Sequence, residues 1–181
     1  MASKIKVDQI QTGDGTGTIA LQNQLSGMTT ASLPTVTTDK LGTGAVLQVV
    51  SSLFNSDVST TSTAWTDTGH SVSITPSSTS NKIFAQLSGG GIGTSAAGGW
   101  VKLDLFRGST GLSGTSVGLS TLYNSGGAIY SNHSLSFLDS PSSTSALTYK
   151  LYIKSNHSSN TSYYHWSDRG KCVLTLMEIA G

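Results

Sequence analysis

Hydrophobic and polar residues alternate along most of the chain after residue 44, with a period of two rather than the 3.6-residue period of a helix. The first sustained strand-forming run is Ala45–Val50, and Leu147–Lys154 places Leu, Tyr and Ile on one side and Thr and Lys on the other. Such segments recur about every ten residues, as they do in β-sandwiches and barrels. We therefore predict an all-β fold with almost no helix.

Most of the predicted strands have one apolar face. In Trp100–Arg107 every second residue is apolar, whereas Lys102 and Asp104 are expected to face water. Gly89–Gly93 lacks the lysine and helix of a phosphate-binding loop, and we predict a flexible loop there. The predicted strands are Ala45–Val50, Ala64–Thr68, Ser71–Thr75, Lys82–Ser88, Trp100–Arg107, His133–Leu138, Leu147–Lys154 and Cys172–Ala180. Together they predict an antiparallel, jelly-roll-like β-sandwich over residues 45–181.

The last predicted strand, Cys172–Ala180, is apolar on both faces. A strand of this kind is usually buried on both sides. We expect a subunit contact to cover the face that carries Leu174 and Leu176, and a central position under the segment Ser155–Lys171 is the alternative. The apolar residues of the two faces are Val173, Met177 and Ile179 on one, and Cys172, Leu174 and Leu176 on the other.

Residues 1–44 form a polar leader that has few apolar residues. Two short strands are predicted there, Ser3–Gln11 and Thr18–Leu25, joined by a Gly-rich turn. An isolated hairpin is at best marginally stable in water. We therefore expect this stalk to order against sister chains or a particle, with a disordered linker as the alternative. The apolar residues expected to make that oligomer interface are Ile5, Val7, Ile10, Ile19 and Leu21.

The sequence Pro-Ser-Ser-Thr-Ser occurs twice, at Pro76–Ser80 and Pro141–Ser145, each time between two predicted strands. Proline ends a ladder of hydrogen bonds, and hydroxyl groups bond to nearby backbone in turns. We predict that each copy forms a corner between two sheets. A chance similarity in a chain rich in Ser and Thr is the alternative.

Composition narrows the functional classes. Charged residues make up 10% of the chain and the formal net charge is +1, which is atypical of a nucleic-acid-binding protein. The single Cys172 cannot form an internal disulfide. No apolar run reaches the length of about 18 residues that a membrane span needs, and the start of the chain does not resemble a signal peptide. We expect synthesis in a cytoplasm, with no membrane insertion.

Residues for catalysis or metal binding are sparse. The four histidines have no ligand spacing with Cys or carboxylates, so we predict solvated side chains and no metal. Asp67 with Asp104 or Asp139 would make a glycosidase pair only if the fold brought them together. We predict neither an enzyme nor a cofactor.

One aromatic cluster precedes the last strand, in a predicted loop. Aromatic rings stack on sugars, and neighbouring polar groups bind sugar hydroxyls. This cluster is therefore a candidate glycan site, and burial of its rings in the fold or a subunit contact is the alternative. Its residues are Tyr163, Tyr164, His165, Trp166, Asp168 and Arg169.

Three stretches resemble the small virion structural proteins of tailed bacteriophages, especially marine and cyanobacterial ones. They are Met1–Gln11, Val72–Ile83 and Leu174–Ala180. The resemblance implies a homotrimeric β-structured appendage on the virion surface, with an N-terminal anchor and a C-terminal β-sandwich head. It carries over no catalytic residue.

The leading functional hypothesis is a capsid-decorating spike attached to phage proteins through residues 1–44. The chain is short for a tail fibre that reaches from a baseplate to a cell. A tail-fibre protein that binds host surface carbohydrate is the second hypothesis. An enzyme such as a depolymerase is the third, and the scarcity of carboxylates disfavours it.

Overall fold

The computed structural model describes residues 41–165 and 170–181. Every regular element in these ranges is a β-strand, and all strand pairs are antiparallel. The strands are β1 (Val46–Phe54), β2 (Val58–Thr60), β3 (Thr66–Ile74), β4 (Lys82–Gly89), β5 (Gly91–Thr94), β6 (Gly99–Arg107), β7 (Thr110–Gly111), β8 (Ser120–Asn124), β9 (Ile129–Asn132), β10 (Leu135–Asp139), β11 (Leu147–Ser155), β12 (Ser162–Tyr164) and β13 (Cys172–Ile179). The all-β prediction is confirmed for this part of the chain.

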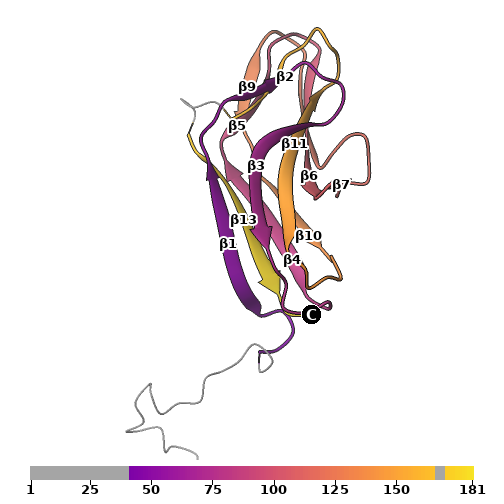
Figure 1. Ribbon diagram of the computed structural model, residues 1–181. Helices are drawn as coiled ribbons and strands as arrows, with labels where there is room; N and C mark the ends of the chain where they lie inside the picture. The colour runs from indigo at the N-terminus through magenta and orange to yellow at the C-terminus, as the bar shows by residue number, and fades with distance from the viewer. Residues whose placement is uncertain (1–40, 166–169) are drawn as a thin grey trace, which may run out of the picture. The chain divides into compact units, whose positions relative to one another are not determined.

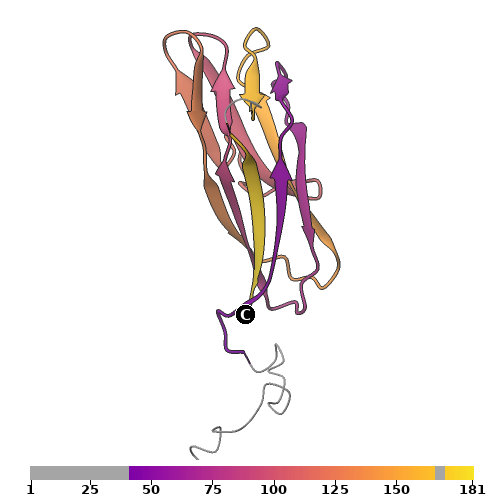
Figure 2. The same cartoon turned by 90° about the vertical axis from the view of Figure 1, so that its left-hand side faces the viewer.

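Two layers of strands pack face to face in a sandwich-like arrangement (Figures 1 and 2). One layer is the four-stranded sheet β1-β13-β4-β10, and the other contains β3-β11-β6-β7 with β8 also paired to β6. The core between them consists of alternate residues, such as Ile83 and Leu87 on β4 and Leu103 and Leu105 on β6, all with 0% exposure. Burial of these side chains drives the two layers together.

A third sheet extends the first layer. Its order, β2-β12-β5-β9, repeats the order β1-β13-β4-β10, and each of its strands is the chain neighbour of the corresponding strand. It lies at the end of the domain opposite the C-terminus (Figure 1). The break between β4 and β5 is Gly90, whose φ of +65° favours glycine. A Cβ there would lie 2.8 Å from the Cys172 Cβ, so close packing also favours glycine.

Most predicted strands are confirmed, with small differences in their bounds. The two predicted segments Ala64–Thr68 and Ser71–Thr75 form one strand, β3. The prediction of a flexible loop at Gly89–Gly93 is wrong, because Gly91–Thr94 is strand β5 and pairs with both β12 and β9. The predicted loop that begins the aromatic cluster is also wrong, because Ser162–Tyr164 is strand β12.

Both copies of Pro-Ser-Ser-Thr-Ser connect one sheet to the other, as predicted. Pro76–Ser80 leads from β3 to β4, and Pro141–Ser145 leads from β10 to β11. The strands around them also pair with each other, β3 with β11 and β4 with β10. The repeated sequence therefore marks two corners at the same end of the sandwich.

The start and the end of the described domain meet. The Gly44 amide donates to the Ala180 carbonyl at 2.8 Å, and the Ala180 amide donates to the Ala45 carbonyl at 2.9 Å. The predicted domain boundary after residue 44 lies next to the start of β1. Residues 1–40, which include most of the predicted stalk and its interface residues Ile5, Val7, Ile10, Ile19 and Leu21, lie outside the described residues.

Candidate functional site

The predicted glycan cluster does not form an open aromatic platform at Tyr164 and His165. Tyr164 is 1% exposed and His165 is 2% exposed, because both side chains point into the protein. Tyr163 is partly buried, and its ring centroid lies 5.5 Å from that of Tyr130. The other three members of the cluster, Trp166, Asp168 and Arg169, lie outside the described residues. The prediction that Tyr164 and His165 bind a glycan is therefore wrong.

Tyr164 belongs instead to a buried hydrogen-bond network at the break between the sheet β1-β13-β4-β10 and the third sheet that extends it. The His70 Nε2 lies 3.1 Å from the Ser52 carbonyl oxygen, which only accepts, so Nε2 donates. The His70 Nδ1 then accepts from the Tyr164 hydroxyl at 2.6 Å. The Cys172 Sγ lies 3.1 Å from the same hydroxyl oxygen, and the Phe54 ring stacks on His70 with centroids 4.9 Å apart.

Burial sets the protonation of this network. It lowers the pKa of His70, an effect that the charge of His165 reinforces, and it raises the pKa of Tyr164 and of the Cys172 thiol. All three groups are therefore neutral near pH 7, and a neutral buried thiol is a poor nucleophile. The prediction of solvated histidines is wrong for His70 and His165 and confirmed for the exposed His157.

The few acidic side chains described have separate structural contacts. Asp67 pairs with Lys150 at 2.9 Å on the outer face of the larger sheet. Asp104, predicted to face water, is 1% exposed and accepts from the Ser113 hydroxyl at 2.7 Å. Burial raises the pKa of Asp104. Asp67 and Asp104 both pair with Tyr152 of β11, one from each neighbouring strand, and each carboxylate is bound by another side chain.

Asp139 and Glu178 are likewise bound within the fold. Asp139 accepts hydrogen bonds from Arg107, at 2.5 and 2.7 Å, and from the Tyr149 hydroxyl at 2.6 Å. Glu178 lies at the corner that contains Ser77, and its hydrogen bonds lower its pKa. Among residues 41–165 and 170–181, no three or more His, Cys, Asp and Glu residues gather as metal ligands.

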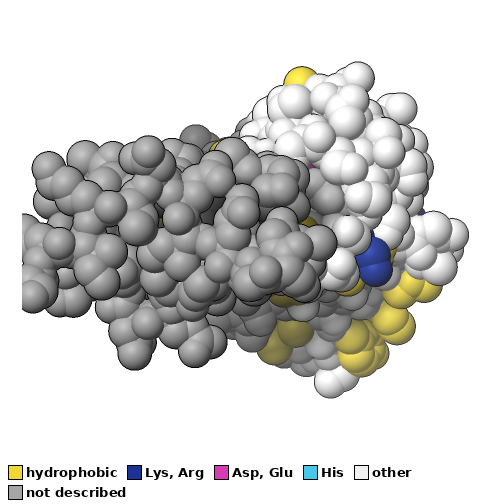
Figure 3. Space-filling model, turned by 90° about the horizontal axis from the view of Figure 1, so that it is seen from below, with side chains coloured by type: hydrophobic (Ala, Val, Ile, Leu, Met, Phe, Trp, Pro, Cys, Tyr) yellow, Lys and Arg dark blue, Asp and Glu magenta, His cyan; other side chains and the backbone are white. Residues whose placement is uncertain are grey.

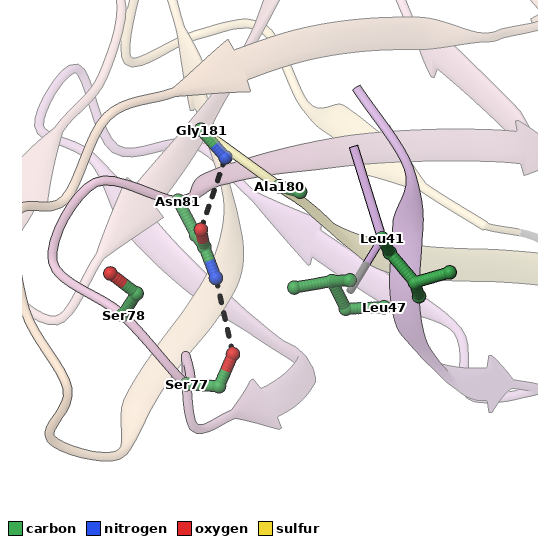
Figure 4. A pocket seen from close by; sticks show the side chains of 7 residues that line it. All are labelled: Leu41, Leu47, Ser77, Ser78, Asn81, Ala180 and Gly181. Atoms are coloured by element: carbon green, nitrogen blue, oxygen red, sulfur yellow. Dashed lines mark hydrogen bonds between the residues drawn. The ribbon is translucent and has the colours of Figure 1, made fainter. Parts of the chain in front are cut away.

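A pocket of about 350 Å³ opens beside the same corner (Figure 4). Leu41 and Leu47 form one wall, while Ser77 and Asn81 lie on the other side. The Gly181 amide donates to the Asn81 Oδ1 at 3.1 Å, and the Asn81 amide group donates to the Ser77 hydroxyl at the same distance. None of the lining side chains ionises. The remaining lining residues are Ser78 and Ala180.

An apolar row crosses the outer face of the four-stranded sheet. Val49 pairs with Met177, Met177 with Phe84, and Phe84 with Leu138, so the row contains one residue from each strand. Val49 is 56% exposed and Leu138 is 50% exposed. Seen from the end that holds the C-terminus, hydrophobic side chains gather on one side of the surface, and another side consists of uncharged polar groups and backbone (Figure 3).

The last predicted strand has its exposed apolar face on the side opposite to the one predicted. Leu174 and Leu176 were expected at a subunit contact, but both are 0% exposed in the core of the chain itself. Val173, Met177 and Ile179 are the partly exposed apolar residues of β13. The sequence showed two apolar faces and did not show which face the core would cover.

Sequence reasoning missed a second exposed feature, the ring pair Trp100 and Tyr123. These residues are direct partners in the β6–β8 pair, and their ring centroids lie 5.0 Å apart. The signal in the sequence was the position of Trp100, on the same strand face as Lys102 and opposite the buried Val101. β8 was not predicted, so nothing indicated that Tyr123 would lie beside it.

No protein-family model matches the chain, and no curated protein matches it. None of the elements in the described part is a helix of the length and hydrophobicity that crossing a membrane requires.

Proposed function

We propose that this chain is a non-enzymatic structural protein of a tailed-phage virion. In this proposal it forms a homotrimeric spike that decorates the capsid, with residues 1–44 as the anchor and residues 45–181 as a jelly-roll-like head on the virion surface. The observation that carries the proposal is the exposed apolar row Val49–Met177–Phe84–Leu138, which a sister copy of the chain would cover. The resemblance of three segments to phage virion proteins supports the viral setting.

The surroundings of the row favour a protein partner of the same kind. Among the outward positions of β1, β13, β4 and β10, all of them described, only Lys82 is charged. Interface cores are depleted in charge, and exposed apolar patches mark contact surfaces. A symmetric assembly presents the same patch on every copy, so one row per chain supplies every contact of a closed ring.

The non-enzymatic part of the proposal is supported by the contacts of the reactive groups. Asp139 is held by Arg107 and Tyr149, and Asp104 by the turn at Ser113. The Cys172 thiol is buried. These contacts stabilise corners, loops and the core, and they leave the groups unavailable to a substrate.

Gold labelling of the protein in intact particles tests the proposal by electron microscopy. We expect label on the head, and we expect a chain that lacks residues 1–44 to fold and yet fail to attach to capsids. Label confined to the tail, or attachment of the shortened chain, would contradict the capsid role.

A tail-fibre protein that binds host carbohydrate is the second candidate function. The specific observation in its favour is the exposed ring pair of Trp100, which is 38% exposed, and Tyr123, which is 51% exposed. Label at fibre tips in the same microscopy experiment would favour this candidate.

A further inference from the structure

The outer face of the five-stranded sheet carries a cluster that we call the aromatic–lysine face: Trp65, Trp100, Lys102, Tyr123 and Lys154. Trp100 and Lys102 alternate along β6 with core residues that have 0% exposure, so their side chains point away from the core. Lys154 on β11 is the direct partner of Lys102, and Tyr123 on β8 is the direct partner of Trp100. Three neighbouring strands therefore build one surface.

Asn156 holds the backbone that carries Trp100. The Trp100 amide donates to the Asn156 Oδ1 at 2.9 Å, and the Asn156 amide group donates to the Gly98 carbonyl at 3.3 Å. The ring planes of Trp100 and Tyr123 are inclined at 54°. Two inclined, exposed rings form a shallow apolar surface of the kind on which the C–H face of a sugar ring packs.

The two lysines place positive charge beside these rings. Lys102 and Lys154 lie directly opposite each other on antiparallel strands, where like charges destabilise a sheet. Burial and the charge of Lys102 both lower the pKa of Lys154. The Lys154 Nζ lies 4.4 Å from the Trp65 ring centroid, and the Lys102 Nζ lies 5.9 Å from that of Trp100.

Neither of these ammonium groups has a carboxylate partner within salt-bridge distance among the described residues. Lys150, on the same strand as Lys154, pairs with Asp67 at 2.9 Å. Asp104, whose charge raises the pKa of Lys154, is buried and accepts a hydrogen bond from Ser113. An anion placed between Lys102 and Lys154 would relieve their repulsion, and Lys150 offers no such site.

We propose that the aromatic–lysine face binds an acidic carbohydrate. A sugar ring packs on Trp100 and Tyr123, and its carboxylate, sulfate or phosphate group lies between Lys102 and Lys154. This inference supplies the ligand class for the second candidate function and rests on neither the capsid location nor the assembly through the apolar row.

The composition of the face favours a saccharide over the two other occupants. Nucleic acid binding needs a longer basic stripe, and the whole chain has a formal net charge of +1. A protein contact needs a wider apolar surface, whereas the neighbours Thr121 and Asn156 are polar. Two rings and two cations match one or two sugar units with an acidic group.

Isothermal titration calorimetry on the full chain tests the proposal with three probes: tetragalacturonate, an α2,8-linked sialic acid trimer and a heparin-derived tetrasaccharide. We expect at least one acidic probe to bind with a Kd below about 1 mM, a weak affinity typical of a small exposed site. For a uronate or sialate probe, the methyl ester is the matched neutral ligand. We expect the neutral ligand to bind at least tenfold more weakly, and we expect added salt to weaken binding of the acidic one.

Two variants locate the site. The double variant Lys102→Gln with Lys154→Gln and the single variant Tyr123→Ala are each expected to weaken binding at least tenfold. The control Lys150→Gln, which changes a lysine of the same sheet, is expected to bind like the unaltered chain. The double variant removes a repulsion and also two contacts between ammonium groups and rings, so its melting temperature is measured as well. A melting temperature close to that of the unaltered chain shows that lost binding is not lost folding.

Four results would overturn the proposal: no binding of any acidic probe at 10 mM by the folded chain, equal binding of the neutral esters, unchanged binding by the double lysine variant, or tighter binding of an oligothymidylate than of every saccharide. The last result would assign the face to single-stranded nucleic acid. None of these results bears on capsid attachment, which the labelling experiment measures separately.

Discussion

Glu178 is a buried carboxylate whose four hydrogen bonds come from uncharged donors. The Gln48 side chain, the Ser77 amide and hydroxyl, and the Asn81 side chain all donate to it, at 2.5 to 2.8 Å. One side chain thereby fastens β1 and the first corner to β13. Donors that converge in this way favour the charged form, which is why its pKa is lowered.

We predict that Glu178→Gln lowers the free energy of unfolding by about 1–3 kcal/mol at pH 7, because the new amide group points a donor at other donors. The folded pKa of Glu178 lies below its unfolded value, so this stabilisation is present above about pH 4.5 and is lost as the pH falls through the folded pKa. Urea unfolding of both proteins at several pH values measures the effect. A difference that stays constant down to pH 3 would contradict it.

His70 makes a separate prediction at higher pH. The pKa of His70 in the folded state lies below the ordinary value of about 6.5, so between these two pH values the unfolded chain binds a proton at His70 and the folded chain does not. The contribution of His70 to the free energy of unfolding is therefore constant above about pH 6.5. It declines as the pH falls from there to the folded pKa. His133, whose pKa burial also lowers, adds to the decline.

The variant His70→Gln should show a shallower decline in urea midpoint between pH 6.5 and 5, because one of the two histidines no longer titrates. Asp67 and Glu178, with lowered pKa values, do not contribute in this window. An unchanged slope would mean that His70 is protonated in the folded state.

Single residues were the hardest to place from the sequence. Asp104 and His70 occupy positions that suit a solvated side chain, and each is buried because a distant segment supplies its partner. Ser113 reaches Asp104 through the turn after β7, and Tyr164 reaches His70 across the sandwich. Such partners depend on the tertiary fold, which local alternation does not specify.

At the scale of elements, the Gly-rich strand β5 shows why glycine can belong to a sheet. A Cβ on Gly93 would overlap the ring of Tyr130 on the adjacent strand β9. The glycine therefore makes room for an aromatic ring. The sequence predicted a loop there because glycine has a low strand propensity, and the ring that requires the glycine lies on a strand distant in the sequence.

We predict that Gly93→Ala lowers the free energy of unfolding by about 1–3 kcal/mol, the usual cost of overpacking. The matched control is Gly126→Ala, since nothing lies within 4 Å of the Cβ position at Gly126. Thermal unfolding followed by circular dichroism compares the two. Equal melting temperatures would show that the β5–β9 pair can spread without cost.

Strands with a strict alternation of one apolar and one polar face were predicted well. β4, β6 and β11 have the expected bounds to within one residue, and their apolar positions face the core. The short strands β2, β9 and β12 contain too few residues for a period to show. They pair with one another and with the four-residue strand β5, in the sheet that begins beyond the break at Gly90.

At the scale of the whole molecule, the apolar row predicts self-association. We predict that the unaltered chain forms trimers and that the double variant Val49→Lys with Leu138→Lys is monomeric at the same concentration, because the charges would be buried unpaired at the contact. Both positions are half exposed, so the fold should tolerate the lysines. Sedimentation velocity measures the assembly state.

The control for this experiment is Val117→Lys, an equally exposed apolar residue (49%) that lies off the row. It should associate like the unaltered chain. A monomeric unaltered chain at 100 µM, or a double variant that still forms trimers, would refute assembly through this face.

The hydrogen bonds that join Gly44 and Ala45 to Ala180 bring the first and last residues of the β-sandwich domain close enough to be joined by a short linker. A circular permutant that joins residue 181 to residue 44 and opens between β8 and β9 would keep every strand pair. Its new ends would emerge at the opposite pole of the domain. A reporter enzyme fused there would be displayed outward, whereas one fused after Gly181 would crowd the point where the chain enters.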